Sequence, residues 1–223
     1  MLSSFFSASS CRMGFTRREL LFGLAVLIAA VIVVTGPVSQ YLAQSRIAHA
    51  VQKGRELNLL LSQYALDNDD TYPIGQGTTA LGKSEGIARN LLNDKYASTP
   101  DIFVLGKALA YTGTAVDFSD FAANQIDWDF TAATSTTGLP ASAPGLLPTL
   151  YATGETVSYP AATGTVVDLT LSGNGPFGLK GMVVGYKNNA VIFIPATPIG
   201  SQAVAKGFIL PAFPGGSYTQ IKP

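Results

Sequence analysis

The chain has 223 residues, with 14 Lys plus Arg, 14 Asp plus Glu, one His and one Cys. A net charge of zero argues against nucleic acid as the main partner, because binding phosphates needs clustered positive charge. One Cys excludes an intrachain disulfide, and one His excludes a site that needs two. Charged residues are 13% of the chain, about half of the roughly 25% typical of soluble domains, and this deficit needs an explanation.

The first predicted element is an apolar helix near the N-terminus. Residues 20–45 contain no charge, and residues 20–34 are an almost unbroken apolar run. A membrane-spanning helix needs about 20 mostly apolar residues. We therefore predict a single transmembrane segment over about residues 20–42, with the following domain outside the cytoplasm. Arginines lie closer to its N-terminal end than to its C-terminal end, which favours an N-terminus inside.

The residues before this run form a recognisable motif, Gly14-Phe15-Thr16-Arg17-Arg18-Glu19. The motif resembles the processing site of type IV pilins and type II secretion pseudopilins. The resemblance implies that residues 1–14 are a leader, that a prepilin peptidase cuts after Gly14, and that the new N-terminal residue, Phe15, is methylated. It also implies that Glu19 pairs with the terminal amine of a neighbouring subunit during assembly. Arg17–Arg18 depart from the family pattern, which is usually apolar at these positions.

Two other interpretations of the same residues remain open. The motif could be an ordinary cluster of charges beside a membrane segment. Alternatively, residues 16–21 fit a twin-arginine export signal, which would make the chain a membrane-tethered or exported enzyme or binding protein. Such a signal is normally followed by a cleavage site between small residues. The stretch after the run holds no convincing site, and Ala48-His49-Ala50, which has the spacing, lies well beyond it.

The helical pattern continues past the apolar run. Gly36 and Pro37 predict a kink, and the residues that follow recur on one helix face, which predicts one long helix over 15–66. The acidic stretch 67–70 and Pro73 should end it. This region is similar to the end of the long helix in major pseudopilins, where a Tyr, an Asp-Asn pair and a Tyr-Pro recur. The face consists of Ile47, Ala50, Gly54, Leu57, Leu61 and Tyr64.

The remaining residues, 67–223, predict a globular head. A short helical pattern covers 84–96, and the stretch 90–106 is similar to head segments of Verrucomicrobia-type pilin-like proteins. We expect a loop over 131–149, an edge strand over 208–210 and strands over 101–105 and 166–171. A hairpin over 182–194 should turn at Asn188-Asn189. The predicted fold class is α+β, pilin-like: a long N-terminal helix, transmembrane in its first half, packed on an antiparallel sheet.

The head offers little that predicts catalysis. The single His49 lies on the long helix near its apolar face, where a packing or surface role is expected. The glycine-rich stretch 173–178 lacks the Lys-Ser/Thr of a phosphate-binding loop. The acidic stretch 67–70 lacks the spacing of a calcium-binding EF-hand loop, so we expect a solvated turn there. Acidic residues around Trp128 could bind calcium or serve hydrolysis, although loop-capping roles are favoured. They are Asp117, Asp120, Asp127 and Asp129.

These observations predict a structural subunit of a type IV pilus or type II secretion pseudopilus, and not an enzyme. No cofactor is expected, with calcium in the head as an open alternative. Expected partners are identical or related pilin subunits, the prepilin peptidase, an inner-membrane assembly platform and, before assembly, the lipid bilayer. The precursor would lie in the bacterial inner membrane, and the mature subunit in a periplasmic or cell-surface filament.

Overall fold

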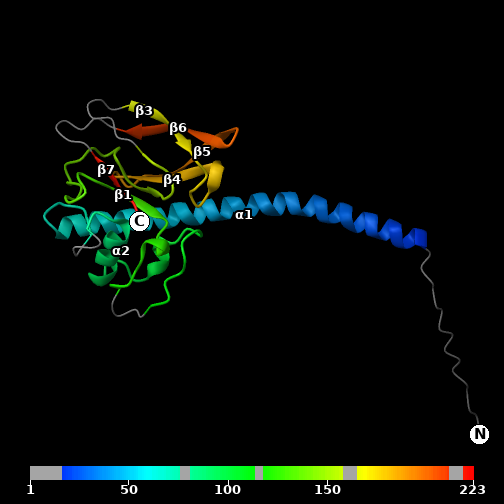
Figure 1. The fold of residues 1–223 in the computed structure, drawn as a ribbon, viewed down its shortest axis with the longest axis horizontal. Helices are drawn as coiled ribbons and strands as arrows, with labels where there is room; N and C mark the ends of the chain where they lie inside the picture. The colour runs from blue at the N-terminus through cyan, green and yellow to red at the C-terminus, as the bar shows by residue number, and fades with distance from the viewer. Residues whose placement is uncertain (1–16, 76–80, 114–117, 158–164, 211–217) are drawn as a thin grey trace, which may run out of the picture. The chain divides into compact units, whose positions relative to one another are not determined.

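The structure, a computed structural model, describes residues 17–75, 81–113, 118–157, 165–210 and 218–223 (Figure 1). Within these ranges, the side chains of residues 17–20, 28–37, 165–167 and 208–210 are not described. The chain divides into two compact units, Met1–Ser45 and Arg46–Pro223. The predicted leader, residues 1–14, lies outside the described residues.

The first element is the helix α1, Arg17–Asp67, which has 51 residues and contributes to both units. The backbone is helical without a break through Gly36 and Pro37. Whether the helix axis bends there, as predicted, stays a prediction. The helix ends at Asp67, the first residue of the acidic stretch 67–70 that was predicted to end it. Asp69 and Asp70 follow with φ angles of 50° and 56°, which no residue of a right-handed helix adopts.

The fold class predicted from the sequence is wrong as stated, because it made the first half of the helix transmembrane. In the part of the chain that the structure describes, no helix combines the length and the apolar character that crossing a membrane requires. The described side chains of α1 in the first unit form two stretches, 21–27 and 38–45, and the second of these includes Ser39, Gln40 and Gln44.

The second unit contains an antiparallel sheet of seven strands within the described residues, in the order β3-β6-β5-β4-β2-β1-β7. The longest pairing joins β3 and β6, and β4 pairs with β5 so that Val183 lies opposite Phe193. The strands are β1 Trp128–Ala132, β2 Pro148–Ala152, β3 Thr165–Leu171, β4 Gly181–Tyr186, β5 Val191–Ile199, β6 Gln202–Leu210 and β7 Thr219–Ile221.

Several predicted elements of the head are confirmed. The helix α2, Ser84–Asn93, lies within the helical pattern predicted over 84–96, and it buries Ile87, Leu91 and Leu92. The strands β4 and β5 form the predicted hairpin, and Asn189 in its turn has a φ of 65°, a conformation that Asn tolerates better than most residues. The strand predicted over 166–171 corresponds to β3.

Other predictions for the head were wrong. The strand predicted over 101–105 is replaced by a 3-10 helix, η1, Pro100–Phe103, because Pro100 at its start favours a helical turn. The predicted strand over 208–210 does form, but as the end of the nine-residue β6; there it pairs with β3, whereas β5 pairs with residues 202–205 of β6. The predicted loop over 131–149 is bounded by β1 and β2, which the sequence analysis missed.

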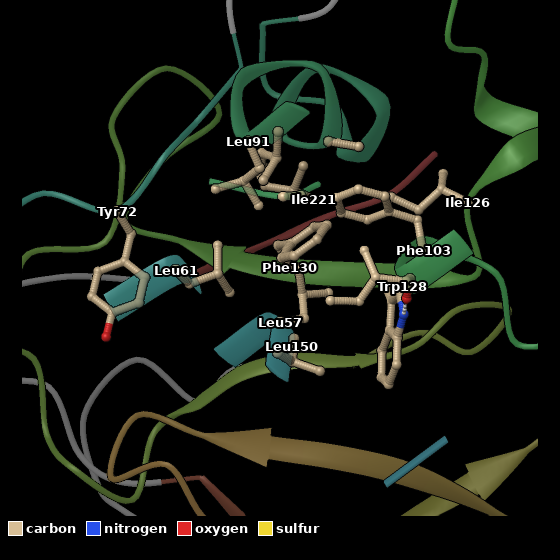
Figure 2. Packing of buried hydrophobic residues seen from close by; sticks show 14 of the residues in the cluster. Leu57, Leu61, Tyr72, Leu91, Phe103, Ile126, Trp128, Phe130, Leu150 and Ile221 are labelled. Carbon is tan, nitrogen blue, oxygen red and sulfur yellow. Dashed lines mark hydrogen bonds between the residues drawn. The ribbon is translucent and has the colours of Figure 1, made fainter. Parts of the chain in front are cut away.

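The core of the second unit lies between the C-terminal half of α1, the helix α2 and the sheet. Figure 2 shows Leu57 and Leu61 of α1 facing the strand residues Phe130 and Leu150. Four positions of the predicted apolar face are buried, whereas Ile47 and Tyr64 at its two ends are half-buried. The buried positions are Ala50, Gly54, Leu57 and Leu61.

Candidate functional site

The predicted processing and assembly residues lie at the margin of the described structure. Gly14 and Phe15 are outside the described residues, and Glu19 lies in the first turn of α1 without a described side chain. Their roles therefore stay predictions. The nearest described side chains begin at Leu21, which is 64% exposed.

The first unit carries a row of exposed apolar side chains along α1. Phe22 is 74% exposed and Tyr41 is 73% exposed, values that are unusual for large apolar residues gathered on one helix. Exposed apolar surface of this extent marks a place where a protein meets another apolar surface. We take this row as the candidate assembly surface. It consists of Leu21, Phe22, Leu24, Val26, Leu27, Val38, Tyr41 and Leu42.

The second half of α1 is fastened to the head by polar contacts that the sequence analysis missed. Asn58 is fully buried, and its Nδ2 donates to the backbone oxygen of Tyr186 at 2.6 Å. Lys53 Nζ donates to the Asp101 carboxylate and to its backbone oxygen, both at 2.7 Å. The sequence did indicate that Asn58 is buried, because it lies four residues after Gly54 and three before Leu61, on the same helix face.

The predicted acidic set around Trp128 does not come together as one site. Asp117 is outside the described residues, and Asp120 accepts a hydrogen bond from the Tyr111 hydroxyl at 2.6 Å. Asp127 is buried, and its carboxylate accepts hydrogen bonds of 2.7–3.0 Å from the backbone N–H groups of residues 105–108. Asp127 therefore holds a loop, which is the capping role that the sequence favoured.

Asp129 belongs to a second polar cluster, centred on Gln220 of β7. Gln220 Nε2 donates to Asp129 Oδ2 at 2.6 Å and to the backbone oxygen of Glu155 at 2.8 Å, while its Oε1 accepts from Val157 N–H at 2.9 Å. Burial raises the pKa of Asp129 to about 6, against hydrogen bonds from Thr153 and Gln220 and the charge of Lys222, which lower it. The cluster ties β7 to β1 and to the loop after β2.

The glycine-rich stretch 173–178 is also held by a carboxylate. Glu155 Oε2 accepts from the N–H of Ser172 at 2.8 Å, and its Oε1 accepts from the N–H of Gly173 at 3.1 Å. The amide group of Gly173, and that of Ser172 just before the stretch, are thus bound to an acidic side chain, which would repel a phosphate.

A hollow of about 410 Å³ lies beside Asp127, with Lys107 and Lys222 in its wall. Lys107 Nζ donates to the backbone oxygen of Asn174, and Lys222 Nζ donates to Thr156 Oγ1 at 2.7 Å. These contacts hold loops together and set up no acid–base pair. His49, the single histidine, is exposed on α1. No group of three or more His, Cys, Asp or Glu side chains suited to a metal ion occurs among the described residues.

Comparison with known proteins finds no match: no family model, no curated protein and no solved structure is similar to the chain.

Proposed function

We propose that the protein is a structural subunit of a type IV pilus or type II secretion pseudopilus, processed after Gly14 and assembled through its N-terminal helix. The observation that carries the proposal is the row of eight exposed apolar side chains on α1, which directly follows the motif Gly14–Glu19. Neighbouring helices of the same kind would bury this row, and each buried side chain would contribute roughly 1.5–3 kcal/mol.

The fastening of α1 to the head supports the same proposal. A filament subunit has to transmit the position of its assembling helix to the domain that it carries. Asn58 and Lys53 link the second half of α1 to β4 and to η1 through hydrogen bonds of 2.6–3.0 Å. The buried residues Leu57 and Leu61 add apolar packing from the same turns.

Within this proposal, each N-terminal residue has a narrow role. Gly14 fits the peptidase because the cut requires a small residue there. Phe15 supplies the new amine, and Glu19 pairs with the amine of a neighbouring subunit. The partners are other pilin subunits, the prepilin peptidase and an assembly platform. The head contributes surface to the filament and no catalysis, and the filament lies outside the cytoplasm.

The test is the amount of the protein in filaments sheared from cells, compared for the wild-type protein and Glu19→Ala. Leaving a neighbour's buried amine without its partner costs about 3–5 kcal/mol, so the filament fraction should fall at least tenfold at unchanged cellular amount. Glu56→Ala is the matched control, because Glu56 is an exposed acid on the same helix. An unchanged filament yield for Glu19→Ala would refute the role of Glu19.

A further inference from the structure

We propose that Asn174 and Gly175 form a self-modifying site, at which the Asn174 side chain is converted to a carboxylate without an enzyme. The two residues lie in the loop between β3 and the 3-10 helix η3, Gly178–Lys180, and they are the only Asn-Gly pair in the chain. Asn174 is exposed, so water, the one co-reactant that the conversion needs, reaches it. The proposal is independent of filament assembly.

The reaction follows from the chemistry of an Asn-Gly pair. The backbone nitrogen of Gly175 loses its proton to a base in the solvent and bonds to Cγ of Asn174, which closes a ring. The bond from Cγ to Nδ2 then breaks, and Nδ2 takes a proton from water and leaves as ammonia. Water opens the resulting succinimide at either carbonyl carbon, which gives aspartate or isoaspartate. A following glycine favours the ring because no Cβ hinders the attacking nitrogen.

The attacking nitrogen is available in this loop. Among the residues that the structure describes, the N–H of Gly175 donates no hydrogen bond. The turn between β4 and β5 offers a contrast, because it also exposes two asparagines, Asn188 and Asn189. There the N–H of Asn189 donates to a backbone oxygen at 2.9 Å, and that of Ala190 donates to Asn188 Oδ1 at 3.1 Å. An N–H held in this way is less free to attack, so the conversion is expected at Asn174 and not in the turn.

A lysine side chain assists the attack. Lys107 Nζ donates to the backbone oxygen of Asn174, which belongs to the same peptide bond as the attacking nitrogen. Loss of the amide proton places negative charge on this oxygen, and an ammonium group beside it stabilises that charge. Lys107 therefore favours the deprotonated form of the Gly175 nitrogen, which is the form that attacks.

The nitrogen that leaves is held as well. Asn174 Nδ2 donates to Ser172 Oγ at 2.8 Å, and Ser172 Oγ donates to Glu155 Oε2 at 3.0 Å. These bonds hold the Asn174 amide beside a hydroxyl group that exchanges protons with water, which suits the protonation of the departing ammonia.

The product changes the charge of the loop. A carboxylate in place of the Asn174 amide no longer donates to Ser172, and only that hydroxyl group separates it from the carboxylate of Glu155. Two carboxylates at one site repel each other, so the hold of Glu155 on the loop weakens. Because the step is slow and irreversible, it marks the age of each molecule.

Peptide mapping by mass spectrometry tests the proposal on the full-length protein, sampled over days at mildly alkaline pH. The peptide that contains Asn174 should gain the mass difference between an amide and a carboxylic acid, and ammonia should be released in equal amount. Peptides that contain Asn188 and Asn189 should convert at least about tenfold more slowly, because the hydrogen bond of each attacking N–H has to break first.

Variants of Lys107 test the assistance. Lys107→Met should slow the conversion of Asn174 at least about threefold, because the deprotonated amide loses its positive neighbour, and Lys107→Arg should restore the rate. Lys180→Met, the same change at an exposed lysine of η3, is the matched control and should leave the rate unchanged. If Lys107 only held the loop in place, its removal would free the loop and speed the conversion.

Three results would overturn the proposal. In the first, Asn174 keeps its amide throughout the incubation. In the second, Asn188 or Asn189 converts as fast as Asn174. In the third, Lys107→Met converts as fast as the wild-type protein or faster.

Discussion

Thr149 Oγ1 of β2 donates a hydrogen bond of 2.6 Å to Asn58 Oδ1 of α1, in the middle of the hydrophobic core. Both residues are buried, and the same hydroxyl group lies 3.1 Å from the backbone oxygen of Gly185. A buried polar residue is costly unless all its groups are paired, and those of Asn58 are. The pair therefore selects one register of α1 against the sheet.

Replacing Asn58 with alanine should destabilise the head by about 1–3 kcal/mol. The substitution removes two hydrogen bonds of a buried side chain, the one donated to the backbone oxygen of Tyr186 and the one accepted from the hydroxyl of Thr149. Urea unfolding followed by the fluorescence of Trp128, the single tryptophan, measures the change. Gln63→Ala, at an exposed position of α1, should change the stability by no more than about 0.5 kcal/mol. Equal effects of the two variants would contradict the role of Asn58.

Gly54→Ala tests how closely α1 approaches the sheet. Glycine to alanine inside a helix is normally stabilising by roughly 0.5–1 kcal/mol. Here the added Cβ would lie 3.0 Å from Val191 Cγ1 and 3.1 Å from Trp128 Cη2. Overpacking of this kind costs about 1–3 kcal/mol, so the urea midpoint should fall.

Gly23→Ala is the matched control for that experiment. A Cβ at Gly23 would meet nothing within 4 Å, so the unfolding midpoint should not fall. A rise in the midpoint of Gly54→Ala would show that α1 does not pack against β1 and β5 as closely as described.

Asp129 should make the stability of the head depend on pH. Burial raises its pKa from 3.8 to about 6, so the folded state binds more protons than the unfolded state between these values. Its contribution is therefore fully present below about pH 4 and is lost as the pH rises through about 6. Denaturant unfolding from pH 4 to pH 8 should show this decline in the wild-type protein.

Asp129→Asn is the variant that isolates this effect. Asparagine keeps an oxygen that can accept from Gln220 and does not ionise. The variant should gain stability relative to the wild-type protein as the pH rises through 4–6. A constant difference between the two proteins across this range would show that Asp129 does not titrate as described.

The elements that the sequence predicted well are those with a strong local pattern. The spacing of Leu57 and Leu61 predicted a buried face on α1, and Asn188-Asn189 predicted the β4–β5 turn. The strands β1 and β2 have only five residues each, and both of their faces are buried, so no contrast between a buried and an exposed face marks them in the sequence.

The candidate site was less predictable for a related reason. Asp127 and Asp129 are two residues apart, and the sequence grouped them, but they serve different partners: a loop after η1 and Gln220 of β7. Contacts between residues this distant in the chain leave no local pattern.

The most direct test of the proposed function is the mass of the mature N-terminus, measured on protein purified from a host that contains a prepilin peptidase. The account predicts a chain that begins at Phe15 and carries one added methyl group. Gly14→Leu should block this processing while leaving the protein expressed. A chain that keeps Met1 in the presence of an active peptidase, or one that begins near Ala50, would contradict the account.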